Sequence, residues 1–480
     1  MNVERRTLAG LKWGATAKVL TQAVSWCVTF AVIRLLAPGD YGLMALSAVI
    51  MATFAGVAEL GLGASLIQAR NPTPADLARV SGALLLLNGS CALIVCLAAP
   101  LFADLFGHER LELVVQVSAL QFILSALSAV PESIAYREMR FKWLAAADIT
   151  SGFVTSATTL TLALLSVGVW ALVIGNLAGL AVRTAMLMYG SPFVRPQLRF
   201  RGMGEYLKFG GAWSGARFAW QLTYQTDIVI AGRFLTQEAV GLYSVATQLA
   251  NLPLQKAMSV INQVAFPAIA RLQEELPRMK RNLLDALRLL GFSAVPALWG
   301  ICAVAPELVR VVLGEQWSGA TLPLQAIALV APLRIVGSIL ATAISALGRA
   351  HLDLINNLVT LAIFPVVLLA SVRWGIGGLA IAYAVAVAVT FVMNFPRTAR
   401  VVGITAAELF TACRGTLLAG VTMLATVTAA RMGLATAPDA ARLAALIIIG
   451  AAAYLGTLWF LDRTIWTEAK RVAAALREQG

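Results

Sequence analysis

The sequence is poor in charged residues and has no long polar stretch. Only 13% of its 480 residues are Asp, Glu, Lys or Arg, and 59% are hydrophobic. Soluble proteins carry about 25% charged and about 45–50% apolar residues, so this composition excludes a soluble protein with a sizeable folded domain. The mean hydropathy of +0.81 is typical of a polytopic membrane protein.

Residues suited to catalysis or metal binding are also scarce. The chain has 2 His, and its 5 Cys lie within or beside apolar runs with no CxxC pair. Neither a disulfide framework nor a metal site is therefore expected. No Walker A motif or other catalytic signature occurs. We predict that the protein is not an enzyme and that it uses no cofactor.

Helices that cross a bilayer need about 20 mostly apolar residues. The sequence contains fourteen runs of that kind, at 11–36, 42–67, 78–103, 112–131, 145–166, 169–190, 207–235, 240–267, 283–305, 322–346, 351–371, 376–395, 407–430 and 441–461. The predicted fold class is therefore an all-α polytopic membrane protein. Residues 462–479 mix charged and apolar side chains, which predicts a short amphipathic surface helix.

The net charge of +13 follows the predicted topology. Most of the excess Lys and Arg falls in loops on the same side as the N-terminus, whereas the loops on the other side are close to neutral. Because Lys and Arg accumulate in cytoplasmic loops, both termini are predicted to be cytoplasmic. The charge therefore gives no reason to expect a nucleic-acid partner.

An internal repeat organises the chain. The stretch 11–44 returns as 207–243, and further pairs follow in the same order: Lys18 with Arg217, Gln22 with Gln221, Gly42 with Gly241, Gly107 with Gly314 and Gly168 with Gly375. Each half has an even number of helices, which indicates a parallel repeat about an axis along the membrane normal. We predict lobes at 1–198 and 199–400, with 401–480 as two appended helices and a tail.

Several segments resemble a known family. The runs Arg34–Leu43 and Glu59–Gln68, and in the second half Tyr243–Thr247, Phe266–Pro267 and Arg271–Gln273, are similar to those of bacterial O-antigen and exopolysaccharide transporters. These belong to the multidrug/oligosaccharidyl-lipid/polysaccharide flippase superfamily. The resemblance implies a central cavity between two six-helix lobes. It also implies movement of an undecaprenyl-pyrophosphate-linked oligosaccharide across the bacterial inner membrane.

Charges at mid-membrane depth are costly and mark a polar pathway or an ion pair. Lys18 and Arg217 are each followed four residues on by a glutamine, Gln22 or Gln221, which lies on the same helical face. Binding of the cargo phosphates by this pair is our hypothesis. A structural ion pair, or a position of Lys18 at the membrane interface, is the alternative. Arg183 is set aside, because it lies near a helix end and can extend to the interface.

A polar stripe runs along the predicted helix 240–267. It predicts a wall facing the glycan, with interhelical hydrogen bonding as the alternative. The residues of the stripe are Tyr243, Thr247, Asn251, Gln255, Ser259 and Asn262. We add as candidates for substrate binding three residues near it or on neighbouring helices, namely Gln225, Lys256 and Arg334.

Three acidic residues within predicted helices, Glu59, Asp148 and Asp227, are candidates for gating or for coupling to H⁺ or Na⁺. Pairing with a lobe cation is the alternative for Glu59 and Asp148. Prolines within predicted spans are expected to kink them; these are Pro253, Pro296, Pro332 and Pro365.

Three other functions stay open at this stage, and one of them, a nonspecific scramblase, has no distinguishing feature in the sequence. A cation-coupled multidrug exporter of the same superfamily would favour an aromatic and acidic cavity, whereas here helical cations outnumber helical acids. A membrane glycan polymerase or ligase would be expected to carry a large outer loop with catalytic Arg or His. The expected partners are the lipid-linked oligosaccharide and membrane lipids, and the expected state is a monomer.

Overall fold

A computed structural model describes residues 25–59, 62–68, 72–191, 194–198, 225–260 and 275–461 of the chain. Every regular element in these ranges is a helix. The elements are α2 (Pro38–Glu59), α3 (Leu62–Gln68), α4 (Pro74–Phe106), α5 (Arg110–Ser118), α6 (Leu120–Arg137), α7 (Phe141–Leu164), α8 (Val169–Tyr189), α10 (Gln237–Val260), α12 (Leu276–Leu308), η2 (Val309–Leu313), η3 (Glu315–Ala320), α13 (Thr321–Ala346), α14 (Ala350–Ser371), η4 (Val372–Trp374), α15 (Gly375–Val402), α16 (Ala406–Gly433) and α17 (Asp439–Leu461). Residues 25–35 and 225–234 are helical as well.

The predicted fold class is confirmed. Within the described ranges, nine helical segments are long and apolar enough to cross a membrane. Each predicted span that falls in those ranges overlaps an observed helix, although 42–67 corresponds to both α2 and α3, and 112–131 to both α5 and α6. A helix satisfies all of its internal backbone hydrogen bonds within one segment, so an apolar run of this length has few other stable forms in hydrocarbon. The predicted surface helix 462–479 lies outside the described residues.

The largest differences from the sequence prediction occur where loops were expected. The predicted loop from Pro306 to Thr321 is helical, because α12 continues past Pro306 and is followed by the π-helical turn η2 and the 3₁₀ helix η3. A proline removes one backbone donor but does not have to end a helix. Glycines end these helices instead: Gly107 after α4 and Gly314 after η2 have φ angles of +72° and +104°, which glycine adopts at low cost.

The predicted repeat has a counterpart in backbone conformation. Gly107 and Gly314, a predicted pair, both have positive φ. A second predicted pair, Gly168 and Gly375, has φ angles of +66° and +73°, and each glycine directly precedes or begins a helix. The described residues form two compact units that meet in sequence at Gly241 and Leu242. The lobe boundaries near residues 198 and 400 remain a prediction.

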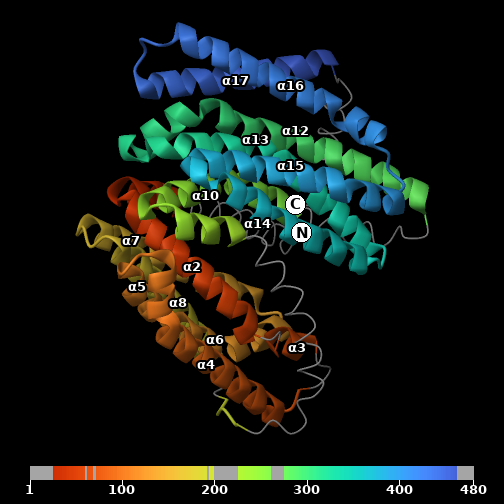
Figure 1. The fold of residues 1–480 in the computed structure, drawn as a ribbon. Helices are drawn as coiled ribbons and strands as arrows, with labels where there is room; N and C mark the ends of the chain where they lie inside the picture. The colour runs from red at the N-terminus through yellow and green to blue at the C-terminus, as the bar shows by residue number, and fades with distance from the viewer. Residues whose placement is uncertain are drawn as a thin grey trace, which may run out of the picture. The chain divides into compact units, whose positions relative to one another are not determined.

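The first unit contains α2 to α8 (Figure 1), and its closest packing joins α7 to α8. Gly175 and Gly179 form a GxxxG motif on α8. A Cβ atom at Gly175 would lie 1.9 Å from Thr159 Oγ1, and one at Gly179 would lie 1.8 Å from Thr155 Oγ1. The Ser151 hydroxyl also donates a hydrogen bond to the Gly179 carbonyl at 2.8 Å. Small residues therefore let the two backbones approach, as in other membrane helix pairs.

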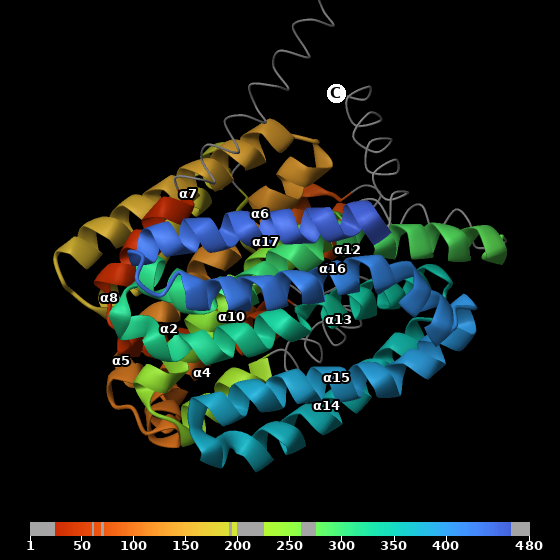
Figure 2. The ribbon, with the colours of Figure 1, turned by 90° about the horizontal axis from the view of Figure 1, so that it is seen from above.

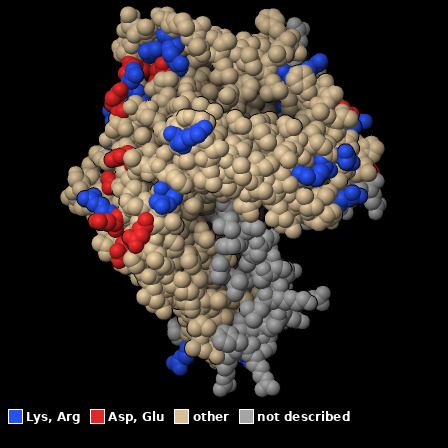
Figure 3. Space-filling model, viewed as in Figure 1, with Lys and Arg blue, Asp and Glu red and all other residues tan. Residues whose placement is uncertain are grey.

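The second unit is built around α12. This helix packs against α13 and α16, α17 lies along α16, and α14 lies along α15 (Figure 2). Leucine and isoleucine side chains of α12 and α13 form the core, among them Leu283, Leu298, Ile335 and Ile339. Charged side chains gather mainly toward the ends of these helices, and the surface between them is largely uncharged (Figure 3). That distribution matches a segment spanning the hydrocarbon layer.

A buried ion cluster attaches α16 and α17 to the end of α12. The Glu307 side chain is only 3% exposed, and its Oε1 lies 2.8 Å from Arg431 Nε and 3.4 Å from Arg442 Nε. A second bond joins Arg431 Nη2 to Glu307 Oε2 at 3.0 Å. Arg431 lies on α16 and Arg442 on α17, so one carboxylate contacts both helices.

The first prediction concerns Glu307. Glu307→Gln keeps the shape of the side chain but removes the counter-charge of Arg431 and Arg442, which are 23% and 17% exposed, so the free energy of unfolding should fall by about 3 kcal/mol. Unfolding in mixed detergent micelles measures the change. The matched control is Glu275→Gln, whose partner Arg278 is 68% exposed, where the loss should stay below about 1 kcal/mol. Equal losses in the two variants would contradict a stabilising role of the cluster.

The second prediction concerns the contact between α7 and α8. Gly175→Leu should lower the free energy of unfolding by about 3 kcal/mol, because the new side chain has to displace Thr159 and push the helices apart. Gly152→Leu is the control, since nothing lies within 4 Å of a Cβ at Gly152 on α7. It should be close to neutral in the same unfolding measurement. A neutral Gly175→Leu variant would show that this contact is not tight.

Candidate functional site

The leading sequence candidates lie outside the described part of the chain. Lys18 and Gln22 precede residue 25, and Arg217 and Gln221 lie between 199 and 224. The candidates Lys256 and Glu59 lie in described helices, but their side chains are not described. Phosphate binding by the repeat-related pair of cations therefore stays a prediction.

Two other predicted residues are in contact. Arg334, near the middle of α13, donates a hydrogen bond from Nη1 to Asn251 Oδ1 of α10 at 2.9 Å. Both side chains are half-buried. The amide oxygen orients the guanidinium group without contributing a negative charge. This pair is the part of the predicted substrate site that the structure brings together.

Prolines flank this pair on both helices. Pro253 follows Asn251 by two residues inside α10, and Pro332 precedes Arg334 by two residues inside α13. Each proline lacks the N–H that would bond the carbonyl four residues earlier. The backbone is therefore weakened at the level of the Arg334–Asn251 contact. All four prolines predicted to lie within spans do lie inside helices, since Pro296 and Pro365 are within α12 and α14.

The polar stripe of α10 is not uniform. Tyr243 is fully buried, and Thr247 Oγ1 is buried without a hydrogen-bond partner among the described residues. Asn251 contacts Arg334, and Gln255 is exposed. The described part of the stripe therefore runs from a buried end to an exposed end. The side chain of Ser259 and all of Asn262 fall outside the description.

The described acidic candidates and Gln225 differ in environment. Asp227 is 5% exposed, and its Oδ1 accepts a hydrogen bond from the Ile228 backbone N–H at 2.9 Å. Gln225, two residues earlier, is half-buried. Asp148 on α7 is instead 59% exposed and lies 2.8 Å from Arg183 Nε.

Arg183, which the sequence analysis set aside, joins three helices. From α8 it contacts Asp148 on α7 and, through Nη2, Glu132 on α6 at 2.8 Å. Two carboxylates around one guanidinium leave this cluster with a net negative charge. Arg183 thus has two ion-pair partners. For Asp148, the structure shows the ion pair that was the alternative to a coupling role, and its cation is Arg183.

A second arginine cluster was missed from the sequence. Arg397 donates hydrogen bonds from Nη2 to Asn394 Oδ1 at 2.7 Å and from Nε to Asn356 Oδ1 at 3.2 Å. The predicted helix ended at residue 395, next to Pro396, which placed Arg397 in a loop. The helix α15 passes through Pro396 and continues to Val402. The polar residues Asn356 and Asn394 inside apolar spans were the available signal.

Comparison with known proteins identifies the family. The sequence profile of the polysaccharide biosynthesis protein family matches residues 31–322, which is more than half of the chain. The chain belongs to this family. The resemblance found in the sequence segments is thereby confirmed.

Relatives of the family come from several bacteria. The chain is 25% identical over 410 residues to the lipopolysaccharide biosynthesis protein WzxC of Escherichia coli K12, covering 82% of this chain and 81% of that protein. It is 24% identical over 324 residues to the teichuronic acid biosynthesis protein TuaB of Bacillus subtilis, covering 66% and 67%. These proteins are relatives of the chain across most of its length.

Solved structures show the fold. The lipid II flippase MurJ, in an inward closed conformation, matches with a TM-score of 0.76 and 16% identity, covering 93% of this chain and 98% of that one. An inward-facing multidrug transporter of the MATE family matches with a TM-score of 0.62 and 14% identity, covering 80% and 96%. The chain therefore has the fold that MurJ and the MATE transporter share.

Proposed function

We propose that the protein is a flippase for a lipid-linked oligosaccharide. It would move an undecaprenyl-pyrophosphate-linked glycan from the cytoplasmic to the periplasmic face of the bacterial inner membrane, for surface or exopolysaccharide synthesis. Family membership carries the proposal, because relatives over most of the chain are named for the synthesis of lipopolysaccharide and teichuronic acid. The fold shared with a lipid II flippase supports it.

The chemistry of such a cargo accounts for the predicted site. A pyrophosphate needs cations within the membrane, and charge-assisted hydrogen bonds from Lys or Arg are the strong ones. Lys18, Arg217, Lys256 and Arg334 would supply them, with Arg334 oriented by Asn251. The glutamines Gln22, Gln221, Gln225 and Gln255 would meet glycan hydroxyls. No covalent step is required of the protein.

Alternating access of two lobes would carry the cargo across. The prolines beside Arg334 and Asn251 weaken the backbone where helices have to bend. Asp227 is the acid best suited to coupling by H⁺ or Na⁺, because a buried carboxylate changes its energy most when it gains or loses a cation. Glu59 and Asp148 are further candidates. The protein would act as a monomer with both termini in the cytoplasm.

The third prediction tests the cations in the producing bacterium. In a strain that lacks the gene, Lys18→Ala, Arg217→Ala and Arg334→Ala should each reduce surface glycan about tenfold at equal protein level, the effect of losing one charge-assisted hydrogen bond. The lipid-linked precursor should accumulate on the cytoplasmic face of the membrane, which an impermeant glycan-binding probe detects in vesicles of known orientation.

Two further observations make this test specific. Arg414→Ala removes an exposed cation from α16 and should leave export unchanged, whereas Arg334→Lys should recover part of it. Full export by both Lys18→Ala and Arg217→Ala would refute the phosphate-binding role. A precursor that reaches the periplasmic face in the deletion strain but is not extended would indicate a polymerase instead.

A further inference from the structure

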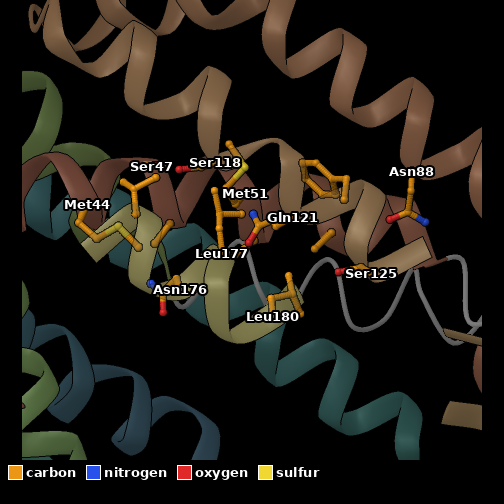
Figure 4. Close-up of a pocket in the computed structure, with 15 residues that line it drawn as sticks. Met44, Ser47, Met51, Asn88, Ser118, Gln121, Ser125, Asn176, Leu177 and Leu180 are labelled. Atoms are coloured by element: carbon orange, nitrogen blue, oxygen red, sulfur yellow. The ribbon is translucent and has the colours of Figure 1, made fainter. Parts of the chain in front are cut away.

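The first unit contains an open cavity of about 470 Å³ lined by α2, α4, α5, α6 and α8. Its lining side chains are strung along it, with Met44 and Ser47 toward one end, Gln121 near the middle and Asn88 at the other end (Figure 4). The exposed residue Asn176 is part of the lining, so the cavity reaches the surface of the unit. Its size falls within the range of about 300–1,000 Å³ that ligand sites occupy.

The lining residues of α2 and of α8 each lie on one face of their helix. On α2 the lining residues recur every three or four positions, and three of them are alanines, Ala48, Ala52 and Ala55. On α8 Asn176 and Leu180 follow the same spacing. Residues at this spacing share one face of a helix. The space therefore exists because α2 presents its small side chains to the interior of the bundle.

Two buried polar side chains of the cavity lining, Ser47 and Asn88, have hydrogen-bonding capacity left over. Ser47 is 1% exposed, and its Oγ forms no hydrogen bond among the described residues. Asn88 is 3% exposed, and its amide nitrogen donates to the Ala58 and Leu84 carbonyls at 3.1 and 2.9 Å. Those two bonds fix the amide and leave its oxygen as an acceptor. An unpartnered buried hydroxyl is costly, which favours a site that an occupant completes.

The described lining identifies the kind of occupant. It contains serine hydroxyls and the amides of Asn88, Gln121 and Asn176, but no Lys, Arg, Asp or Glu. A pyrophosphate would find no cation among the described lining residues, and an isoprenoid tail would leave their polar groups unpaired. A sugar ring fits both parts of the lining, because its hydroxyls both donate and accept while its C–H faces pack on apolar side chains. Phe122 and Leu177 are among the apolar side chains of the lining.

We infer that this cavity is a subsite for an uncharged sugar of the glycan, separate from the cationic site for the pyrophosphate. The inference rests on the proposed function for the origin of the sugar. Gln121 is the central polar residue of the subsite, since its amide can donate to one hydroxyl and accept from the next. Ser47 and Asn88 would complete the contacts at the two ends.

The fourth prediction tests this subsite on the purified full-length protein in lipid nanodiscs. The probes are methyl glycosides of a hexose, a 6-deoxyhexose and an N-acetylhexosamine, titrated by saturation-transfer NMR. The wild type should bind at least one of them, and Gln121→Leu and Ala52→Phe should each weaken that binding about tenfold, by removing hydrogen bonds or by filling the space. The same two variants should bind undecaprenyl phosphate with an affinity within about twofold of that of the wild type, which native mass spectrometry measures.

Controls separate binding from folding. Ser47→Ala is a minimal variant that should fold normally and weaken glycoside binding, and Gln248→Leu makes the same chemical change as Gln121→Leu at an exposed position of α10 and should have no effect. Unchanged glycoside binding in the three cavity variants, or no glycoside binding by wild type, would overturn the subsite. So would a loss of undecaprenyl phosphate binding in the cavity variants. Glycoside binding without any binding of undecaprenyl phosphate would refute the proposed function and leave the sugar site standing.

Discussion

Arg431 and Arg442 lie on apolar helices, and the buried carboxylate of Glu307 holds both. The cost of burying a charge without a counter-charge or hydrogen-bond partner explains this contact and several others. Arg183 contacts two carboxylates from two neighbouring helices, and Arg397 is bound by amide oxygens within the pair α14 and α15. In each cluster one charged side chain needs partners on a neighbouring helix. These contacts select which helices pack together, since apolar helix surfaces alone distinguish poorly between neighbours.

A second cost, that of unpaired backbone N–H and C=O groups in hydrocarbon, explains how much of the fold could be predicted. An apolar run in a membrane has to form a helix to satisfy its backbone, so the positions of the spans follow from composition alone. The ends of helices are less determined. The helix predicted to end at residue 395 continues through Pro396, because losing one backbone donor costs less than exposing a turn of unpaired carbonyls.

Pairing between helices could not be predicted from the sequence. Glu307 was assigned to a loop and Arg183 was treated as a residue reaching the interface, because a linear sequence does not show which helices are neighbours. The contact between Arg334 and Asn251 joins two residues that were chosen separately, 83 positions apart in the chain. The sequence thus indicated which charged and polar residues are costly to place within apolar helices. Only the packing of the helices shows which of these residues contact one another.

The repeat is seen more clearly in the backbone than in the side chains. Met139, before α7, has a φ of +53°, and Gly348, before α14, has a φ of +73°. Each directly precedes the arginine at the N-cap of the next helix, Arg140 or Arg349. A methionine in this conformation costs about 1–2 kcal/mol relative to the right-handed form. The turn is therefore kept in the first half although its residue is poorly suited to it, which indicates that the fold imposes the conformation.

Against this shared backbone, the two halves differ in charge. Arg183 on α8 pairs with carboxylates of α6 and α7, whereas Arg397 on α15 is bound by neutral amides of α14 and α15. The cavity of the first unit has no charged residue in its described lining. Of the predicted phosphate-binding cations, Lys18 belongs to the first half, while Arg217, Lys256 and Arg334 belong to the second. Under the proposed function, a cargo with an anionic end and a neutral glycan would meet two unlike halves, and such a difference would orient it during transport.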